Sequence, residues 1–222
     1  CVGYMVEGAS GHVENDEERL VKTPWFDYEI PFTQAAAIGT EKVIKEHSTI
    51  GIVVTTDGSF GEIPRNGYID AERQTIEELK RIGKPFLMLL NTNRPYSDEV
   101  RDLAAALGEE YGVQVLPVNC EQLKKEDITR ILGEVLNEFP VTELDFVMPK
   151  WAEILPSDHW LKEQNVSIVK GLMGDIIQMK DLAPEYAQPE DLAVRRVHLR
   201  KADYSDGTVA LDVVVDDNVY YQ

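Results

Sequence analysis

Three short apolar runs, each followed by a segment with helical spacing, dominate residues 50–140 of this 222-residue chain. The runs cover residues 50–56, 86–90 and 113–118, and they are rich in Ile, Val, Leu and Met. Continuous apolar runs of this length are typical of parallel strands that are buried on both faces. Because parallel neighbours require crossover connections, which are almost always right-handed, the pattern predicts a three-layer α/β sheet.

End signals locate the helices that follow these runs. We expect helices over residues 70–82 and 98–111, with Asp70 as the cap of the first, because a short polar side chain can accept the free backbone N–H groups there. Gly83 and Gly112 follow the last periodic residues, and glycine is the residue that most often ends a helix.

Polar residues follow each of the three runs, at residues 55–58, 91–94 and 119–121. The carboxyl ends of parallel strands lie at one edge of a sheet, and ligands of open α/β sheets bind at that edge. The sequence therefore predicts a ligand site built from these three loops.

Composition narrows the classes of partner and compartment. The chain carries 22 Lys and Arg against 40 Asp and Glu, a net charge of −18 that repels nucleic-acid backbones and anionic lipid surfaces. Two cysteines are too few for a disulfide framework or a zinc site. The sequence has neither an apolar run long enough to span a bilayer nor a signal peptide at its start, so we expect a cytoplasmic protein.

The two ends of the chain are less regular than its centre. Residues 1–4 are expected to be the tail of a strand, and residues 33–46 an Ala-rich helix. Beyond residue 140 we expect a long helix over 160–182 and a hairpin of strands 196–202 and 208–215, joined through an Asp-Gly turn.

The string EHSTIGIVVTTDG at residues 46–58 resembles the stage IV sporulation protein A family. Shorter matching strings are CVGY at 1–4, TPW at 23–25, GKPF at 83–86, RPY at 94–96, EFPV at 138–141 and DHWL at 158–161. The resemblance covers most of the chain and fades from Ala183 onward.

This resemblance implies an ATPase of endospore-forming bacteria that assembles the basement layer of the spore coat. Its nucleotide-binding domain is of the P-loop GTPase type and is followed by middle and C-terminal domains. On this basis the chain is an internal fragment that lacks the P-loop. Residues 1–140 would be the C-terminal part of the P-loop NTPase domain, and residues 141–222 a linker and the beginning of an α+β middle domain.

The resemblance also implies ligands, partners and a location. The intact protein would use ATP and Mg²⁺, whereas this chain, without the P-loop, is expected to hold neither tightly and to contain no catalytic residue. The implied partners are further copies of the protein, other spore coat proteins and a small amphipathic membrane-anchoring peptide, with no nucleic acid and only indirect membrane contact. The implied location is the mother-cell cytoplasm, at the outer surface of the forespore.

Three residues are candidates for nucleotide contact. Gly3 matches the family position at which a backbone N–H approaches the γ-phosphate, where a side chain would block the approach. Asn91 ends the second apolar run, at the position of Asn in the GTPase base-recognition motif N-K-x-D. Asn119 falls in the loop that makes the last base contacts in that fold.

The base-recognition motif departs from the GTPase pattern, because Arg94 stands where that motif has Asp. An arginine presents only hydrogen-bond donors, so it cannot accept the two N–H groups of guanine. The departure disfavours GTP and fits ATP. The alternative is that Asn91 and Asn93 only shape the turn after the strand.

The remaining reactive side chains indicate no further chemistry. Cys120 is expected to be a small, semi-buried packing residue rather than a nucleophile, because no activating base lies near it in the sequence. The histidines have no metal-ligand spacing, and they are His12, His47, His159 and His198. Two other functions stay open: a catalytically inactive α/β interaction module, and a small-molecule enzyme that uses the same strand ends.

Overall fold

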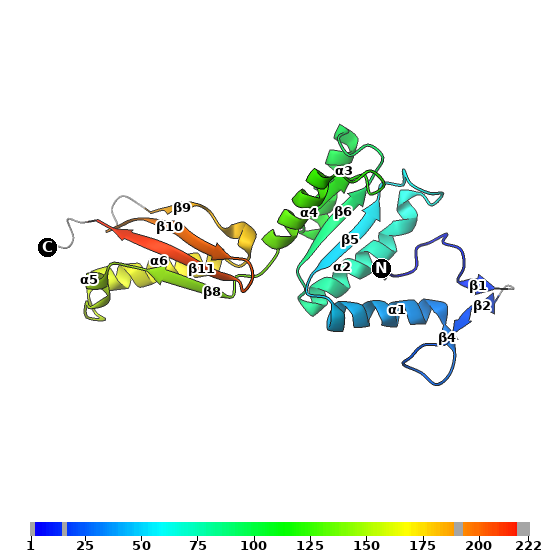
Figure 1. Cartoon of the computed structure of the whole chain (residues 1–222), viewed down its shortest axis with the longest axis horizontal. Helices are drawn as coiled ribbons and strands as arrows, with labels where there is room; N and C mark the ends of the chain where they lie inside the picture. Colours follow the sequence, from blue (N-terminus) through cyan, green and yellow to red (C-terminus); the bar gives the residue numbers. More distant parts are fainter. Residues whose placement is uncertain (1–2, 15–16, 189–192, 217–222) are drawn as a thin grey trace. The chain divides into compact units, whose positions relative to one another are not determined.

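A computed structural model describes residues 3–14, 17–188 and 193–216 of the chain (Figure 1). The chain forms two compact units, Cys1–Val135 and Leu136–Gln222, and each is treated by itself below. The strand tail expected at residues 1–4 falls partly on Cys1 and Val2, which lie outside the described residues.

The centre of the first unit is a parallel sheet of three strands. They are β5 (Gly51–Thr56), β6 (Phe86–Asn91) and β7 (Val115–Val118), in the order β5-β6-β7. β6 is the central strand, and its buried apolar residues explain why its sequence does not alternate with polar ones. This sheet and its helices confirm the predicted α/β class.

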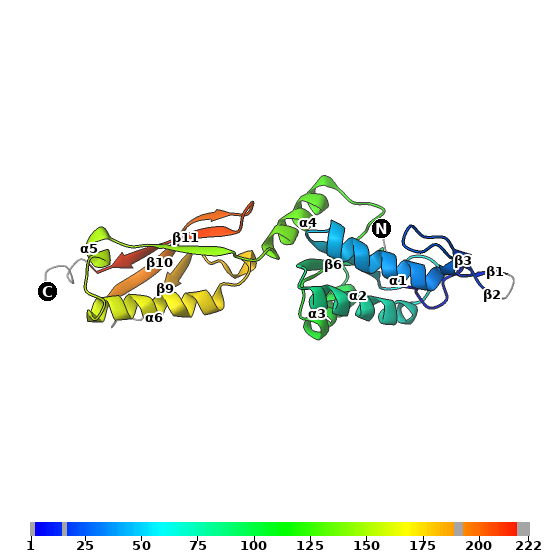
Figure 2. The same ribbon diagram turned by 90° about the horizontal axis from the view of Figure 1, so that it is seen from below.

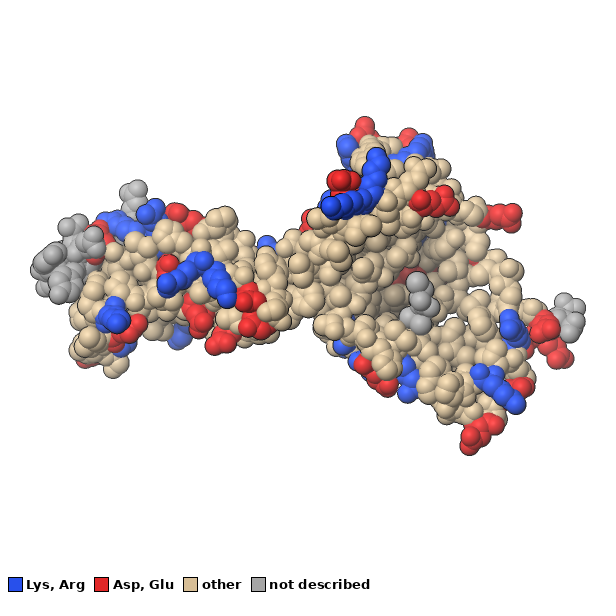
Figure 3. Space-filling model, viewed as in Figure 1, with Lys and Arg blue, Asp and Glu red and all other residues tan. Residues whose placement is uncertain are grey.

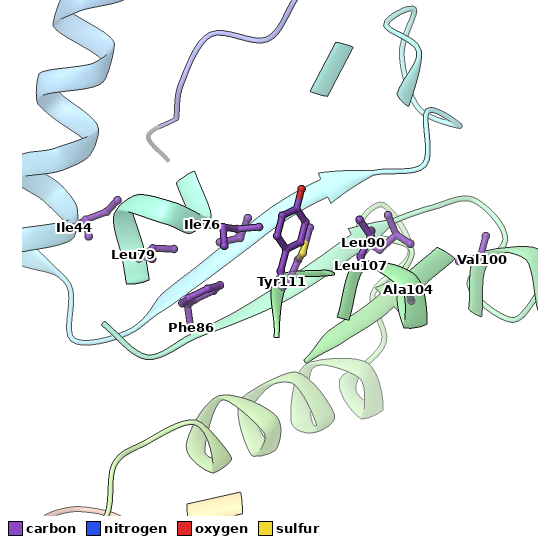
Figure 4. Packing of buried hydrophobic residues seen from close by; sticks show 11 residues of the cluster. Ile44, Ile76, Leu79, Phe86, Leu90, Val100, Ala104, Leu107 and Tyr111 are labelled. Carbon is purple, nitrogen blue, oxygen red and sulfur yellow. The ribbon is translucent and has the colours of Figure 1, made fainter. Parts of the chain in front are cut away.

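Helices cover both faces of this sheet. They are α2 (Ile69–Ile82), α3 (Asp98–Tyr111) and α4 (Lys125–Asn137), and α4 lies on the opposite side of the sheet from α2 and α3 (Figure 2). The side chains of α2, α3 and one face of the strands form a single core (Figure 4). Its buried members are Ile44, Val53, Ile76, Leu79, Phe86, Met88, Leu90, Val100, Ala104, Leu107 and Tyr111.

The helix ends follow the sequence signals with one exception. Gly83 and Gly112 end α2 and α3 with φ of 72° and 60°, the left-handed conformation that glycine adopts without strain. Asp70 does not cap α2 as expected. The chain enters that helix through a 3₁₀ turn, Arg65–Tyr68, so the helix starts one residue earlier and Asp70 lies inside its first turn.

The N-terminal part of the first unit is an arm of short ladders and one helix. β1 (Val13–Glu14) pairs with β2 (Glu17–Glu18), and β3 (Leu20–Val21) pairs with β4 (Ile30–Pro31). The expected Ala-rich helix is α1 (Phe32–Lys42), which continues as a π-helical turn, Val43–His47.

The second unit packs helices on a mixed sheet. Its strands have the order β8-β11-β10-β9, and they are β8 (Glu143–Val147), β9 (Glu185–Ala187), β10 (Val194–Asp203) and β11 (Thr208–Val215). Its helices are α5 (Lys150–Glu153), α6 (Trp160–Asp175) and a 3₁₀ turn, Met179–Asp181.

The second unit confirms one sequence prediction and corrects another. β10 and β11 form the expected antiparallel hairpin. The long helix expected over residues 160–182 instead ends at Asp175, because Ile176 turns to an extended conformation with φ −99° and ψ 93° and enters the buried core.

Charged side chains of both signs are interspersed over the face shown in Figure 3. None of the helices in the described part of the chain is long and apolar enough to cross a membrane.

Candidate functional site

Asn91 links the ends of two neighbouring strands. It is the last residue of β6, and its side-chain Oδ1 accepts a hydrogen bond of 2.9 Å from the backbone N–H of Cys120, in the loop after β7. In addition, Thr92 N–H donates to the carbonyl of Val118 at 2.9 Å. Asn91 therefore joins the loop after β6 to the loop after β7.

The loop after β5 joins the same edge through Asp57. Its Oδ2 accepts a 2.6 Å hydrogen bond from the hydroxyl of Thr92, which is fully buried, and its Oδ1 accepts from the N–H of Ser59 at 2.9 Å. Burial raises the pKa of Asp57, but the hydrogen bonds from Ser59 and Thr92 outweigh burial and leave that pKa below its usual value. A carboxylate is thereby fixed at the edge of the sheet.

Asn119 shapes the third loop. Its Oδ1 accepts from the N–H groups of Glu121 and Gln122, at 3.0 and 3.2 Å, which is an Asx-type turn. The structure thus brings Asn91 and Asn119 to one edge, as predicted from the strand ends.

A cleft of about 400 Å³ opens between the loops that follow β6 and β7. Its polar walls include Arg94, Asn119, Lys124 and Arg130, with Tyr96 beside them. Arg94 and Arg130 pair with Glu99 and Asp127 at 3.4 and 4.0 Å, both near the surface. The remaining lining residues are Asn93, Pro95, Ser97, Pro117, Val118, Gln122 and Asp127.

Three basic side chains and one carboxylate, that of Asp127, line this cleft, and two of the basic side chains are paired with carboxylates, so its lining is polar and mildly positive in a chain of net charge −18. A cleft that combines cations, amide groups and an aromatic ring can hold a polar, planar or anionic ligand.

Cys120 contributes its backbone N–H group to this edge of the sheet, rather than its thiol. Burial raises the pKa of the Cys120 thiol, which lowers its thiolate fraction and so its reactivity.

Gly3 lies apart from the two asparagines. Its carbonyl is 3.2 Å from the hydroxyl of Thr40 in α1, and it lines a second cleft with Trp25 and Phe32. Among the described residues, no heavy atom lies within 4 Å of the point that a Cβ on Gly3 would occupy. No contact recorded for the described residues joins Gly3 to Asn91 or Asn119.

The sequence interpretation missed a buried polar network beneath β5. Glu72 is 5% exposed, and its Oε1 accepts from Arg65 at 2.8 Å and from the hydroxyl of Tyr111 at 2.9 Å. Arg65 also donates to Thr55 at 3.2 Å. A signal was present, because Glu72 precedes Ile76 by four residues and so places a charge on the apolar face of α2.

The described ranges hold no group of three or more His, Cys, Asp and Glu side chains arranged to bind a metal ion.

Comparison with known proteins identifies two family profiles. Residues 1–140 match the profile described as stage IV sporulation protein A, ATPase domain, and residues 141–222 match its middle domain. No solved structure matches the chain.

Curated relatives match along the whole chain. The chain is 41% identical to stage IV sporulation protein A of Bacillus anthracis, 40% identical to that of Bacillus subtilis (strain 168) and 42% identical to that of Clostridioides difficile (strain 630). In each case the alignment covers 100% of this chain but 45% of the relative, so the chain spans about half the length of these proteins.

Proposed function

The chain belongs to the stage IV sporulation protein A family, a family of sporulation proteins with an ATPase domain, and we propose that it is part of an ATP-hydrolysing scaffold. In this proposal the intact protein assembles with copies of itself into the basement layer of the spore coat on the forespore surface. Family membership carries the proposal, and the cleft at the carboxyl edge of the sheet supports it.

The proposed fold of the first domain is that of a P-loop GTPase. The parallel order β5-β6-β7 and the polar loops at one edge support this assignment. Residues 1–140 would be the C-terminal part of that domain, and residues 141–222 a linker and the beginning of the middle domain.

The proposed ligand is ATP with Mg²⁺, bound by the intact protein. Asn91 and Asn119 would border the base, which the 2.9 Å bond from Cys120 N–H to Asn91 supports. Gly3 would approach the γ-phosphate, and the open space around its Cα supports that role. Arg94 at the wall of the cleft favours adenine, because it offers only donors where guanine presents donors of its own.

We further propose that the protein works in the mother-cell cytoplasm and contacts the forespore membrane indirectly, through a small amphipathic peptide and other coat proteins. The net charge of −18 supports indirect contact, since it opposes docking on anionic lipids.

A second candidate is a catalytically inactive interaction module. In that case the cleft between the loops that follow β6 and β7 would not bind a nucleotide.

Nucleotide preference tests the leading proposal. In the full-length parent, Arg94→Asp would supply the acceptor that guanine requires, so we expect the ratio of ATP to GTP affinity to fall at least about tenfold, the effect of one or two new hydrogen bonds. Competition binding against a fluorescent ATP analogue measures this ratio. Arg101→Asp is the matched control, because Arg101 is an exposed arginine that pairs with Asp98 at 3.5 Å and does not line the cleft.

An unchanged ratio in the Arg94→Asp variant would remove Arg94 from base selection. Failure of the parent to bind either nucleotide would overturn the proposed function itself and favour the interaction module.

A further inference from the structure

Tyr96 is the most exposed aromatic side chain that the structure describes, at 72%. It lines the cleft between the loops after β6 and β7, and no hydrogen bond or ring contact joins its side chain to another described residue. None of the other described residues that line the cleft is aromatic. A tyrosine ring offers a large flat apolar surface with a polar tip, and such rings are enriched at binding surfaces.

The backbone that carries Tyr96 is fixed by its own hydrogen bonds. Ser97 N–H donates to the carbonyl of Arg94 at 3.1 Å, which closes a turn with Pro95 and Tyr96 at its centre. Proline presets the backbone at that place in a turn. In addition, Arg94 N–H donates to Thr92 Oγ1 at 3.1 Å, and Ser97 caps α3. The ring is therefore carried by a preorganised turn, which lowers the entropy cost of binding a ligand.

The opposite wall of the cleft carries a side-chain amide without a partner. Gln122, in the loop after β7, donates its backbone N–H to Asn119, but its side chain has no hydrogen-bond partner among the described residues. By contrast, Asn119 Oδ1 already accepts from two N–H groups, and Asn91 is not among the described residues that line the cleft. Gln122 is therefore better placed than either asparagine to offer a ligand both an acceptor and a donor.

An aromatic ring on one wall and an unpartnered amide on the other match the chemistry of adenine. The face of a base stacks on aromatic side chains. The edge of adenine carries an amine donor beside a ring-nitrogen acceptor, and an Asn or Gln amide meets that pattern with two hydrogen bonds. Arg94, Lys124 and Arg130 offer only donors, so they cannot accept from the amine.

We propose that Tyr96 stacks on the adenine ring of bound ATP and that the Gln122 amide forms hydrogen bonds with the edge of the same ring. The inference rests on the proposed nucleotide function and adds to it two residues from facing walls of the cleft. Tyr96 holds the base whatever its identity, whereas Gln122 distinguishes adenine from guanine.

Binding of ligands with and without a base to the full-length parent tests the role of Tyr96. We expect Tyr96→Ala to lower the affinity for ATP at least about fivefold, the low end for the loss of one base-stacking ring, and Tyr96→Phe to retain it. The affinity for inorganic tripolyphosphate, which has no base, should change in neither variant. Isothermal titration calorimetry measures both ligands. Tyr28→Ala is the matched control, because Tyr28 is a 64% exposed tyrosine of the N-terminal arm that does not line the cleft.

Base selection tests the role of Gln122. Gln122→Glu replaces the amide donor with a second acceptor, which suits the adjacent N–H groups of guanine and repels the ring nitrogen of adenine. We therefore expect the ratio of ATP to GTP affinity to fall at least about threefold. Gln74→Glu is the matched control, since Gln74 is an exposed glutamine of α2 outside the cleft.

The outcomes separate this inference from the function on which it rests. Unchanged ATP affinity in the Tyr96→Ala parent, or an equal loss for ATP and tripolyphosphate, would overturn stacking on Tyr96. An unchanged ratio in the Gln122→Glu parent would overturn base reading by Gln122. Either result leaves the proposed function standing, because the unaltered parent still binds ATP. Failure of the unaltered parent to bind any nucleotide would overturn the proposed function and this inference together.

Discussion

Glu72 is an exception among the charged residues that the structure describes in the first unit, because its carboxylate is buried. A buried ion pair contributes little net stability compared with apolar residues of the same shape, yet removing one partner is costly. Glu72 accepts hydrogen bonds from Arg65 and Tyr111, and Arg65 also donates to Thr55. Burial, and then the hydrogen bond to Glu72, raise the pKa of Tyr111 to about 12, so this hydroxyl donates throughout the physiological range.

Replacing Arg65 should therefore destabilise the first unit. Arg65→Met leaves the carboxylate of Glu72 buried without its cation, and we expect the free energy of unfolding to fall by about 3 kcal/mol, the lower end for buried pairs because the Arg65 side chain is 19% exposed. Urea denaturation at neutral pH measures the change. Arg73→Met is the control, since Arg73 and Glu110 form a pair at 3.6 Å whose side chains are about half exposed, and it should cost less than about 0.5 kcal/mol. Equal losses of unfolding free energy in the two variants would show that the buried pair contributes no more to stability than the exposed pair.

At the scale of single residues, the sequence predicted where side chains lie better than which hydrogen bonds they form. Asn91 and Asn119 could be placed at one edge from the strand ends alone. Their partners could not, because the bond from Cys120 N–H to Asn91 depends on how closely two loops approach. Glu72 was missed for a related reason, since its burial is stabilised by residues 7 positions before and 39 positions after it.

The strands and helices were predictable where one local signal dominates. β6 and α3 follow from a continuous apolar run and from a clear end signal at Gly112. The prediction was wrong where tertiary packing decides an end: α6 stops at Asp175 because Ile176 joins the core, although its apolar pattern continues.

The hairpin between β10 and β11 depends on one glycine. Gly207 has φ of 80°, and a Cβ there would lie 2.8 Å from Thr142 Oγ1 and 2.9 Å from the carbonyl of Pro140. Gly207→Ala should lower the stability of the second unit by at least about 2 kcal/mol, from backbone strain and overpacking together. In the control Gly171→Ala, within α6, nothing lies within 4 Å of the new Cβ, so helix propensity should raise stability by up to about 1 kcal/mol. Thermal unfolding followed by circular dichroism distinguishes the loss of stability expected for Gly207→Ala from the gain expected for Gly171→Ala.

For the molecule as a whole, we expect the 222-residue chain to hydrolyse ATP no faster than buffer. Phosphoryl transfer depends on positioning and on charge neutralisation by a P-loop lysine and Mg²⁺, and the printed sequence contains no P-loop string. Phosphate release in the presence of Mg²⁺ measures the rate. Magnesium-dependent release that survives stringent purification would contradict this expectation.

Membrane contact is a second property of the whole molecule. If membrane contact is indirect as proposed, the full-length parent should bind anionic vesicles weakly until the proposed amphipathic peptide is added, because these 222 residues carry a net charge of −18 and α6 mixes Lys162 and Lys170 with Glu163 and Asp175. Co-sedimentation with and without the peptide measures this. Tight, salt-insensitive binding in its absence would assign membrane recognition to the protein itself.

The residues just before position 140 decide where the second unit must begin when it is expressed alone. The ATPase profile ends at residue 140, whereas the second compact unit already begins at Leu136. Glu138, 4% exposed, pairs with Lys180 at 3.0 Å, and the carbonyl of Phe139 accepts from Met179 N–H at 2.9 Å. A cut at the family boundary would therefore leave Lys180 without its anion and expose Phe139. Expression of the second unit should start at or before Leu136.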